Sequence, residues 1–244
     1  RDINGCVLLD LSNIDEMGFK SKYAELYQKL EKFDKKPLRQ KILISPVYHF
    51  FIGGIDIDSK GRTNLKGLFS CGESVGGLHG ANRLEGNALP EAIVFGMISG
   101  KYGAKLSRGN DFRKSKMPDF ELEHYRKGSV FLFELKKELQ NVMWRHCSII
   151  RSYTCLKKAK DKINIISKSM ENVNIKDTSD ILAFYELKNM LITSKLIIEG
   201  AIFRKESRGA HYRSDFPKED NINFRGNLFY QYKNGEMKMK FKYI

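Results

Sequence analysis

A glycine-rich stretch between His49 and Phe95 constrains this chain more than any other feature, and it reads HFFIGGIDIDSKGRTNLKGLFSCGESVGGLHGANRLEGNALPEAIVF. It holds two Gly-Gly pairs, an acidic residue at the end of an apolar run, and a His and an Arg within one glycine-rich turn. Small residues then open a helical pattern at Ala88. Glycine lets a backbone approach a ligand closely, so the stretch predicts a binding site.

The residues before and inside this stretch alternate between short extended and helical patterns. The run CVLLDL, residues 6–11, predicts a strand, and Ser12-Asn13 is positioned to cap a helix that continues to Phe33. Pro37 ends that helix, and residues 41–47 are extended in pattern. The segments GGIDID and GLFSC, residues 53–58 and 67–71, predict two more strands, the second ending at Gly72-Glu73.

The second half of the chain is helical in pattern. One helix is predicted from Ala88, with Pro90 in its first turn, and a polar linker follows over residues 107–118. Apolar periodicity then predicts three helices, over about 120–146, 149–170 and 179–204, arranged as an antiparallel bundle. Residues 227–244 are typical of a hairpin around Asn234-Gly235. We therefore predict an α/β part, a three-helix bundle and a short C-terminal hairpin.

Composition narrows the class of protein. The formal net charge of +14 is spread along the chain among acidic residues, without an Arg-rich block, which argues against specific nucleic-acid binding. No apolar run reaches transmembrane length, and no secretory leader is visible. The four cysteines lack the spacing of metal ligands and indicate reduced thiols. These features predict a cytoplasmic protein or the soluble subunit of a larger assembly, and the absence of an initiator Met suggests a fragment.

Four positions in the glycine-rich stretch suit an anionic or planar ligand. Glu73 is expected at the carboxyl edge of a sheet, where it could bind ligand hydroxyls or simply be a surface residue. The helix that opens at Gly86-Asn87 offers free N–H groups and a positive dipole end to negative charge, unless Asn87 is only an N-cap. His79 and Arg83 share one turn and could hold a dicarboxylate, although an isolated His is more often structural.

A second polar cluster follows the third predicted helix of the bundle, with the sequence RKESRGAHYRSDFP over residues 204–217. It brings Arg208, His211, Arg213, Glu206 and Asp215 close together in sequence. It is either an anion or cofactor contact or a buried polar network that docks the helices on the rest of the fold. The phosphate-binding motifs GxGxxG and GxxxxGK[ST] are absent, so the chain has places for an anion and a ring but no pyrophosphate cradle.

At HFFIGG, GLFSCGE, LHGANRLEGNAL and RKESRGAHYRSDFP the sequence resembles the flavoprotein family of succinate dehydrogenase, fumarate reductase and L-aspartate oxidase. The resemblance covers nearly the whole chain but only the C-terminal half of the family. It implies that the N-terminal dinucleotide-binding unit, most of the capping domain and the proton-donating Arg of the family lie outside this sequence. It also implies domains at 1–48 (end of the capping domain), 49–107 (C-terminal part of the FAD-binding domain), 108–217 (helical domain) and 218–244 (C-terminal tail, expected as a hairpin).

The resemblance assigns roles to individual residues. His49 and Arg83 would each bind a substrate carboxylate, with Arg83 also near the flavin. Glu73 would hold the ribityl chain of FAD. The backbone of Asn87, Ala88 and Leu89 would meet the pyrimidine edge of the flavin. His79 would be structural, and the Arg208 region would pack the helical domain on the FAD domain.

The resemblance implies an FAD-dependent oxidoreductase that interconverts succinate and fumarate by hydride transfer at flavin N5. L-aspartate oxidation is the close rival, because RTNLKGLF and RKESRG also suit that enzyme. A non-catalytic subunit that completes a flavoprotein assembly, or a basic RNA-associating helical domain, are alternatives of a different class. The implied partners are an N-terminal half, on this or a separate chain, and an iron–sulfur electron-transfer subunit, which would make the chain a peripheral part of a membrane complex. No metal ligand is expected in this chain.

Overall fold

The computed structural model describes residues 6–33, 37–39, 41–108, 128–233 and 236–244. The chain divides into two compact units, residues 1–51 and 52–244, and each is described by itself. In the described residues helices are mixed with three two-stranded sheets. None of the described helices combines the length and the apolar character that a membrane crossing requires.

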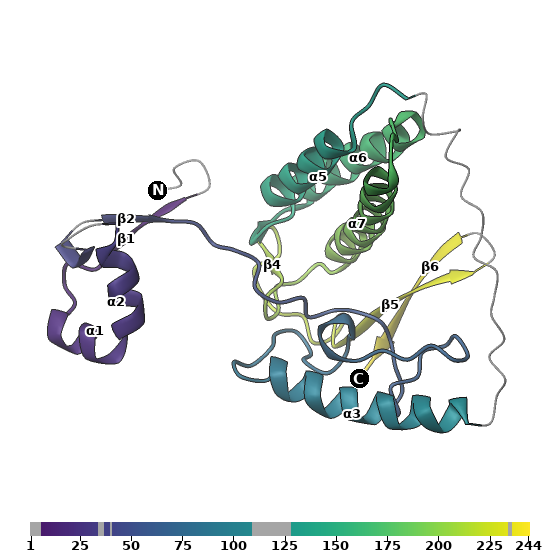
Figure 1. Cartoon of the computed structure of the whole chain (residues 1–244), viewed down its shortest axis with the longest axis horizontal. Helices are drawn as coiled ribbons and strands as arrows, with labels where there is room; N and C mark the ends of the chain where they lie inside the picture. Colours follow the sequence, from purple (N-terminus) through teal and green to yellow (C-terminus); the bar gives the residue numbers. More distant parts are fainter. Residues whose placement is uncertain (1–5, 34–36, 40, 109–127, 234–235) are drawn as a thin grey trace. The chain divides into compact units, whose positions relative to one another are not determined.

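The first unit pairs a two-stranded sheet with two short helices (Figure 1). Strand β1 (Val7–Asp10) runs antiparallel to β2 (Lys41–Ile44), and the 3₁₀ helix η1 (Pro37–Arg39) leads into β2. Helices α1 (Glu16–Lys22) and α2 (Ala24–Glu31) lie between the strands in sequence. A small core joins these elements and consists of Leu11, Phe19, Tyr27 and Leu38, flanked by Leu30 and Ile42.

The single helix predicted from Ser12-Asn13 to Phe33 is wrong in two respects. Asp15 is the N-cap, and its carboxylate accepts a hydrogen bond from the Gly18 N–H at 2.7 Å, so the helix starts later. Tyr23 then leaves the helical region, with φ −130° and ψ 45°, and separates α1 from α2. The break lets α2 turn back against α1. The Tyr27 hydroxyl then donates a hydrogen bond to Glu16 Oε1 at 2.8 Å.

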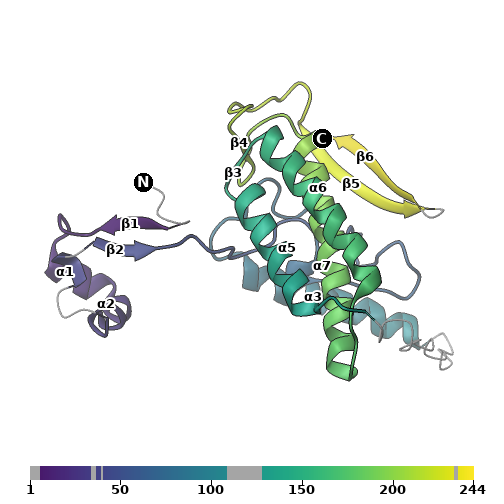
Figure 2. The same cartoon turned by 90° about the horizontal axis from the view of Figure 1, so that it is seen from above.

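Most of the apolar core of the second unit lies among three helices, which Figures 1 and 2 show side by side. These are α5 (Leu132–His146), α6 (Tyr153–Ser169) and α7 (Thr178–Phe203). Their buried faces carry apolar residues at helical spacing, as the sequence predicted, and the 3₁₀ helix η3 (Met170–Asn172) connects α6 toward α7. The start predicted for the first of these helices, near residue 120, lies outside the described residues.

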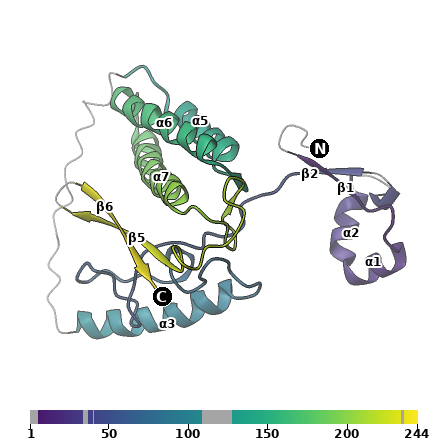
Figure 3. The same ribbon diagram turned by 180° about the vertical axis from the view of Figure 1, so that it is seen from behind.

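Two strand pairs complete this unit. Strand β3 (Ile150–Arg151) pairs in parallel with β4 (Tyr212–Arg213), so the segment before α6 meets the segment after α7. Strands β5 (Gly226–Lys233) and β6 (Glu236–Tyr243) form an antiparallel ladder in which Tyr230 is opposite Met239. Phe241 of this ladder stacks near Phe203 at the end of α7, with ring centroids 5.8 Å apart. The ladder and α7 are seen from behind in Figure 3.

The segment before α3 (Ala88–Ser107) does not contain the two strands predicted over residues 53–58 and 67–71. Among the described residues it forms isolated bridges, Ile55 with Val75 and Arg62 with Phe69, together with the 3₁₀ helix η2 (Gly72–Ser74). Alternating apolar residues are not sufficient for a strand, because each strand also needs a partner in register over several residues.

Candidate functional site

The two Gly-Gly pairs of the sequence meet each other in space. Ile55 donates to Ser74 O at 2.8 Å, and Gly76 donates to Ile55 O at 3.1 Å. A Cβ on Gly54 would lie 2.4 Å from Ser74 O, and one on Gly76 would lie 2.7 Å from the Gly54 nitrogen. Only glycine therefore permits this approach, which fixes the start of the loop that carries His79 and Arg83.

Glu73 lies on the short helix η2 rather than at the end of a strand, so the sheet-edge position predicted for it is wrong. Its side chain is exposed. The turn is held by Val75 N–H donating to Gly72 O at 3.0 Å and by the Ser74 hydroxyl donating to Cys71 O at 2.9 Å. The turn that carries Glu73 is therefore held by hydrogen bonds.

His79 is tied to the first turn of α3. Its Nε2 lies 2.8 Å from Glu91 Oε2, and the two side chains are only 5% and 2% exposed. A buried pair of this kind is expensive to separate, because each polar group would lose its partner away from water. The contact therefore locks the loop onto α3. Glu91 was not singled out in the sequence, since a Glu in a first helical turn is commonly a surface residue.

Asn87, Ala88 and Leu89 form the N-terminus of α3, and Arg83 lies in the turn that precedes it. Arg83 is half-buried, and its Nη1 donates to Leu84 O at 3.1 Å. Asn87 is the N-cap residue, but its backbone is helical, with φ −79° and ψ −9°, and its side chain makes no capping bond. The first N–H groups of α3 are thus not taken by that side chain. Leu89 is 75% exposed.

This helix terminus has the chemistry that an anionic, planar group requires. Backbone N–H groups and the helix dipole favour negative charge at this terminus. Small residues at Gly86 and Ala88 leave the backbone accessible, since a Cβ on Gly86 would meet nothing within 4 Å. This terminus therefore suits a planar group that carries hydrogen-bond acceptors or negative charge along one edge.

The second polar cluster is a buried network. Glu206 is fully buried and accepts bonds from Arg204, from Arg208 Nη2 at 2.9 Å and from the Asp220 N–H at 2.8 Å. Burial acts to raise the pKa of Glu206, but the bonds from Arg208, Asp220 and Arg204 outweigh it and hold the pKa below its usual value. Of the two interpretations of this cluster, the network is the one that the structure shows.

Arg213 and His211 complete this network. Arg213 is 1% exposed and forms a two-bond fork with Asp215, at 2.7 and 2.8 Å, which lowers the Asp215 pKa to about 2. Burial lowers the pKa of His211 to about 4, and the positive charges of Arg151, Arg204 and Arg213 act in the same direction. His211 Nδ1 lies 3.0 Å from Arg151 Nη1, so the neutral ring links the network to the β3–β4 pair.

The network also contacts the loop of the candidate site. The Ala210 N–H donates to Ala81 O at 3.1 Å, two residues before Arg83. Gly209 has a φ of +55°, and a Cβ there would lie 2.2 Å from Ala81 O. The docking of residues 204–217 onto the Arg83 turn therefore depends on glycine at position 209. No local pattern indicated this contact, because the two segments lie far apart along the chain.

His49 belongs to the first unit and is exposed, whereas Arg83 belongs to the second. The structure describes the two units separately, so the predicted pairing of these residues around one substrate stays a prediction. The described residues contain no group of three or more His, Cys, Asp or Glu side chains arranged to hold a metal ion.

Comparison with known proteins gives matches to two protein families. Residues 136–244 match a family described as "Fumarate reductase flavoprotein C-term", and residues 1–89 match "FAD binding domain". An uncharacterised FAD-dependent oxidoreductase of Methanocaldococcus jannaschii is 39% identical over 233 residues, which cover 93% of this chain and 43% of that protein. One subunit of the fumarate reductase (CoM/CoB) of Methanothermobacter marburgensis is 37% identical over 88% of this chain and 41% of its own length.

The fold is also similar to that of a solved quinol fumarate reductase. A variant of the quinol fumarate reductase of E. coli aligns with a TM-score of 0.81 and 26% identity, covering 98% of this chain and 44% of that chain. The chain thus spans less than half the length of each of these relatives.

Proposed function

Because the chain belongs to the flavoprotein family of succinate dehydrogenase, fumarate reductase and L-aspartate oxidase, we propose that it forms the C-terminal part of an enzyme that interconverts succinate and fumarate. The family is one of FAD-dependent oxidoreductases, which indicates FAD as the cofactor. The observation that carries the proposal is the N-terminus of α3, which is not capped by the Asn87 side chain and lies directly after the Arg83 turn.

In this proposal the residues of the chain bind and orient. The backbone of Asn87, Ala88 and Leu89 meets the pyrimidine edge of the flavin, where the helix dipole stabilises negative charge. Glu73 holds the ribityl hydroxyls from the turn at η2. Arg83 and His49 each bind one carboxylate of the substrate, so that the diacid is fixed in one orientation. FAD, when bound, supplies the hydride chemistry at N5.

Support for these roles comes from what surrounds the Arg83 turn. The turn is held on one side by the buried pair of His79 and Glu91 and on the other by the bond from Ala210 to Ala81. A guanidinium that must meet a carboxylate through two bonds gains most when its backbone is fixed, because less conformational entropy is lost on binding. The polar network at residues 204–217 therefore serves the site indirectly.

The finer organisation is part of the proposal. We assign residues 1–48 to the end of a capping domain, 49–107 to the C-terminal part of the FAD-binding domain, 108–217 to a helical domain built on a three-helix bundle, and 218–244 to a C-terminal hairpin. The pyrophosphate cradle and the proton donor come from an N-terminal half, on the same or a separate chain. An iron–sulfur subunit is the proposed electron partner, in a peripheral position on a membrane complex.

The test is reconstitution of the chain with its N-terminal half and FAD, followed by assays of fumarate reduction, succinate oxidation and L-aspartate oxidation. We expect flavin binding and turnover of the C4 dicarboxylates. If L-aspartate were turned over faster than either dicarboxylate, L-aspartate would take the place of succinate and fumarate as the proposed substrate. Absence of both bound flavin and turnover would refute the proposal.

The Arg83→Gln variant tests the residue assignment. Loss of a pair of charge-assisted hydrogen bonds to a carboxylate costs about 2–5 kcal/mol. The value of kcat/KM is therefore expected to fall at least about 30-fold. Arg145→Gln is the matched control, because Arg145 is an exposed arginine on α5, an element that carries none of the proposed site residues. Equal kcat/KM values for the two variants would refute the assignment of Arg83 as a substrate-binding residue.

A further inference from the structure

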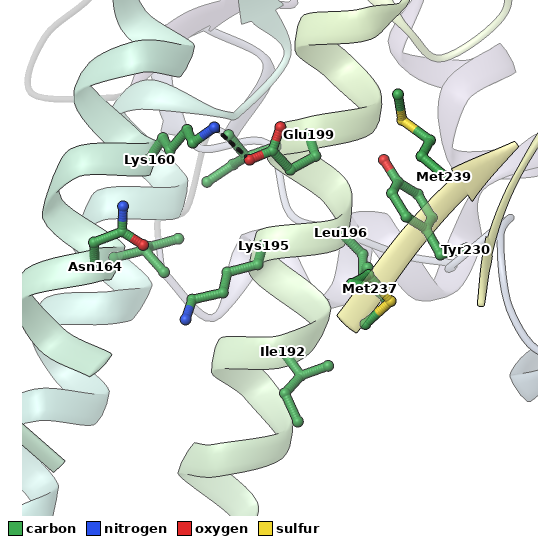
Figure 4. A pocket seen from close by; sticks show the side chains of 11 residues that line it. Lys160, Asn164, Ile192, Lys195, Leu196, Glu199, Tyr230, Met237 and Met239 are labelled. Atoms are coloured by element: carbon green, nitrogen blue, oxygen red, sulfur yellow. Dashed lines mark ion pairs between the residues drawn. The ribbon is translucent and has the colours of Figure 1, made fainter. Parts of the chain in front are cut away.

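A groove runs along one face of α7, and its lining contains none of the residues proposed to bind flavin and substrate. It encloses a cavity of about 350 Å³. Residues Ile192, Lys195, Leu196 and Glu199 form its floor at helical spacing, α6 forms one wall, and the β5–β6 ladder forms the other (Figure 4). We call it the α7 groove. Its volume lies at the small end of the range of ligand pockets, which is about 300–1,000 Å³.

The two walls of the α7 groove differ in chemistry. On the α6 side, Lys160 forms an ion pair with Glu199 at 2.6 Å, and Lys195 donates to the Ser167 hydroxyl at 2.9 Å. Figure 4 shows the Lys195 amine directed away from the ladder. These charges are therefore already engaged with their neighbours. The ladder side presents Tyr230, Met237 and Met239, so that part of the groove is uncharged.

Tyr230 contributes an unusual polar atom to this wall. Its Oη is buried and has no hydrogen-bond partner within the described part of the chain. Burial raises the Tyr230 pKa, and the negative charge of Glu199 raises it further, so the hydroxyl stays protonated. A buried donor without a partner has lost its bonds to water and gained none in return, so a small movement of the Tyr230 side chain that brings the hydroxyl from α7 to an acceptor in the groove is favourable.

The ring of Tyr230 can approach α7 because Gly200 has no side chain. A Cβ at position 200 would lie 3.2 Å from Tyr230 Oη, so a larger residue would displace the hydroxyl. The methionines opposite are flexible and polarisable, and their sulfur atoms make favourable contacts with aromatic rings. The floor from Ile192 to Glu199 spans about 10 Å at the rise of an α-helix, which is the scale of one small aromatic molecule.

We propose that the α7 groove binds a small uncharged molecule that has an apolar ring and one carbonyl oxygen. The ring packs between Leu196 and the two methionines, and the carbonyl oxygen accepts a hydrogen bond from Tyr230 Oη after a small movement of the Tyr230 side chain toward the groove. An anionic head group is disfavoured there, because the Glu199 carboxylate lies near the hydroxyl. A bound ligand also bridges α7 and the ladder, so it stabilises their contact.

The experiment uses the full 244-residue chain with ¹³C-methyl-labelled methionine, titrated with acetophenone and followed by NMR. The Met237 and Met239 methyl signals, assigned by single Met→Leu substitutions, are expected to shift with acetophenone. Ethylbenzene has the same shape without the oxygen, and it should bind about tenfold more weakly, as the loss of one hydrogen bond requires. Benzoate should also bind more weakly than acetophenone.

The Tyr230→Phe variant isolates the hydroxyl. It should fold normally, since the removed atom has no partner among the described residues, and it should bind acetophenone and ethylbenzene equally. Tyr232→Phe is the matched control, because Tyr232 is on the same strand and 70% exposed, and it should keep the tenfold preference. Absence of shifts at Met237 and Met239, or equal binding of the two probes by the parent chain, would overturn the proposal.

Discussion

Gly209 offers the sharpest test of how the candidate site is held together. A Cβ at this position would lie 2.2 Å from Ala81 O and 2.5 Å from the Ala81 carbonyl carbon, at a φ of +55°. We predict that Gly209→Ala destabilises the second unit. The positive φ costs about 1–2 kcal/mol for alanine, and loss of the bond from Ala210 to Ala81 adds about 1 kcal/mol. The expected total is therefore about 2–3 kcal/mol.

The measurement is thermal unfolding of the full chain, followed by circular dichroism. For a unit of this size, 1 kcal/mol lowers Tm by about 2–4 °C, so Gly209→Ala should lower it by about 4–12 °C. Urea unfolding at 25 °C provides the free energy of unfolding independently. In the reconstituted enzyme, the same variant should also raise the KM for fumarate, because the Arg83 turn shifts.

Two other glycines separate the contributions. Gly80 has a φ of +58°, but a Cβ there would meet nothing within 4 Å, so Gly80→Ala should show only the backbone cost of about 1–2 kcal/mol. Gly100 lies within α3 with open space around it, and Gly100→Ala should stabilise by up to about 1 kcal/mol. If Gly209→Ala and Gly80→Ala were equally stable, close docking on Ala81 would be refuted.

Three further changes test other contacts. Glu91→Ala should lower the free energy of unfolding by about 3 kcal/mol, measured by urea titration, because it leaves buried His79 without its partner. Phe241→Ala should lower it by about 2 kcal/mol in the same titration, since it removes the half-buried ring that stacks on Phe203. His211 binds protons less readily in the folded state, so stability should fall by about 1–2 kcal/mol as pH drops from 6.5 toward 4, and His211→Gln should abolish that loss.

Controls for these changes use exposed residues of the same kinds. Glu134→Ala on α5 and Tyr232→Ala on β5 should each change the free energy of unfolding by less than about 0.5 kcal/mol. If a control variant lost as much free energy of unfolding as Glu91→Ala or Phe241→Ala, burial of the substituted side chain would not explain the destabilisation. For His211, an identical pH dependence in parent and variant would assign the acid sensitivity to other groups.

Local patterns predicted much of the fold. The helices expected over 149–170 and 179–204 match α6 and α7 within four residues, and the strand expected over 6–11 contains β1. The spacing of apolar residues was sufficient to predict these elements, because each of them buries one face and the residues of that face recur at a regular interval in its own sequence. The break at Tyr23 was missed, because the apolar residues on both sides keep helical spacing and tertiary contacts decide the kink.

The candidate site was predicted in part. The turn with Arg83 and the start of α3 were recognised, since glycines and small residues mark them locally. The contacts that hold this turn were not, because Glu91 and Gly209 carry no local signal of their distant partners His79 and Ala81. Glu73 was predicted just beyond the end of a strand, at a sheet edge, whereas its neighbour Gly72, with a φ of +69°, begins a short 3₁₀ helix.

The short parallel pairing of β3 and β4 has a consequence for how the chain folds. Its contacts join positions far apart, such as Ser214 and Arg151, which are separated by 63 residues. Closing such a loop is slow compared with forming α6 and α7, whose contacts are local. During refolding, the helical signal should therefore appear first. Residues 204–217, which pack on the Arg83 turn, should reach their final position last. The ability to bind a ligand should then appear later than the secondary structure.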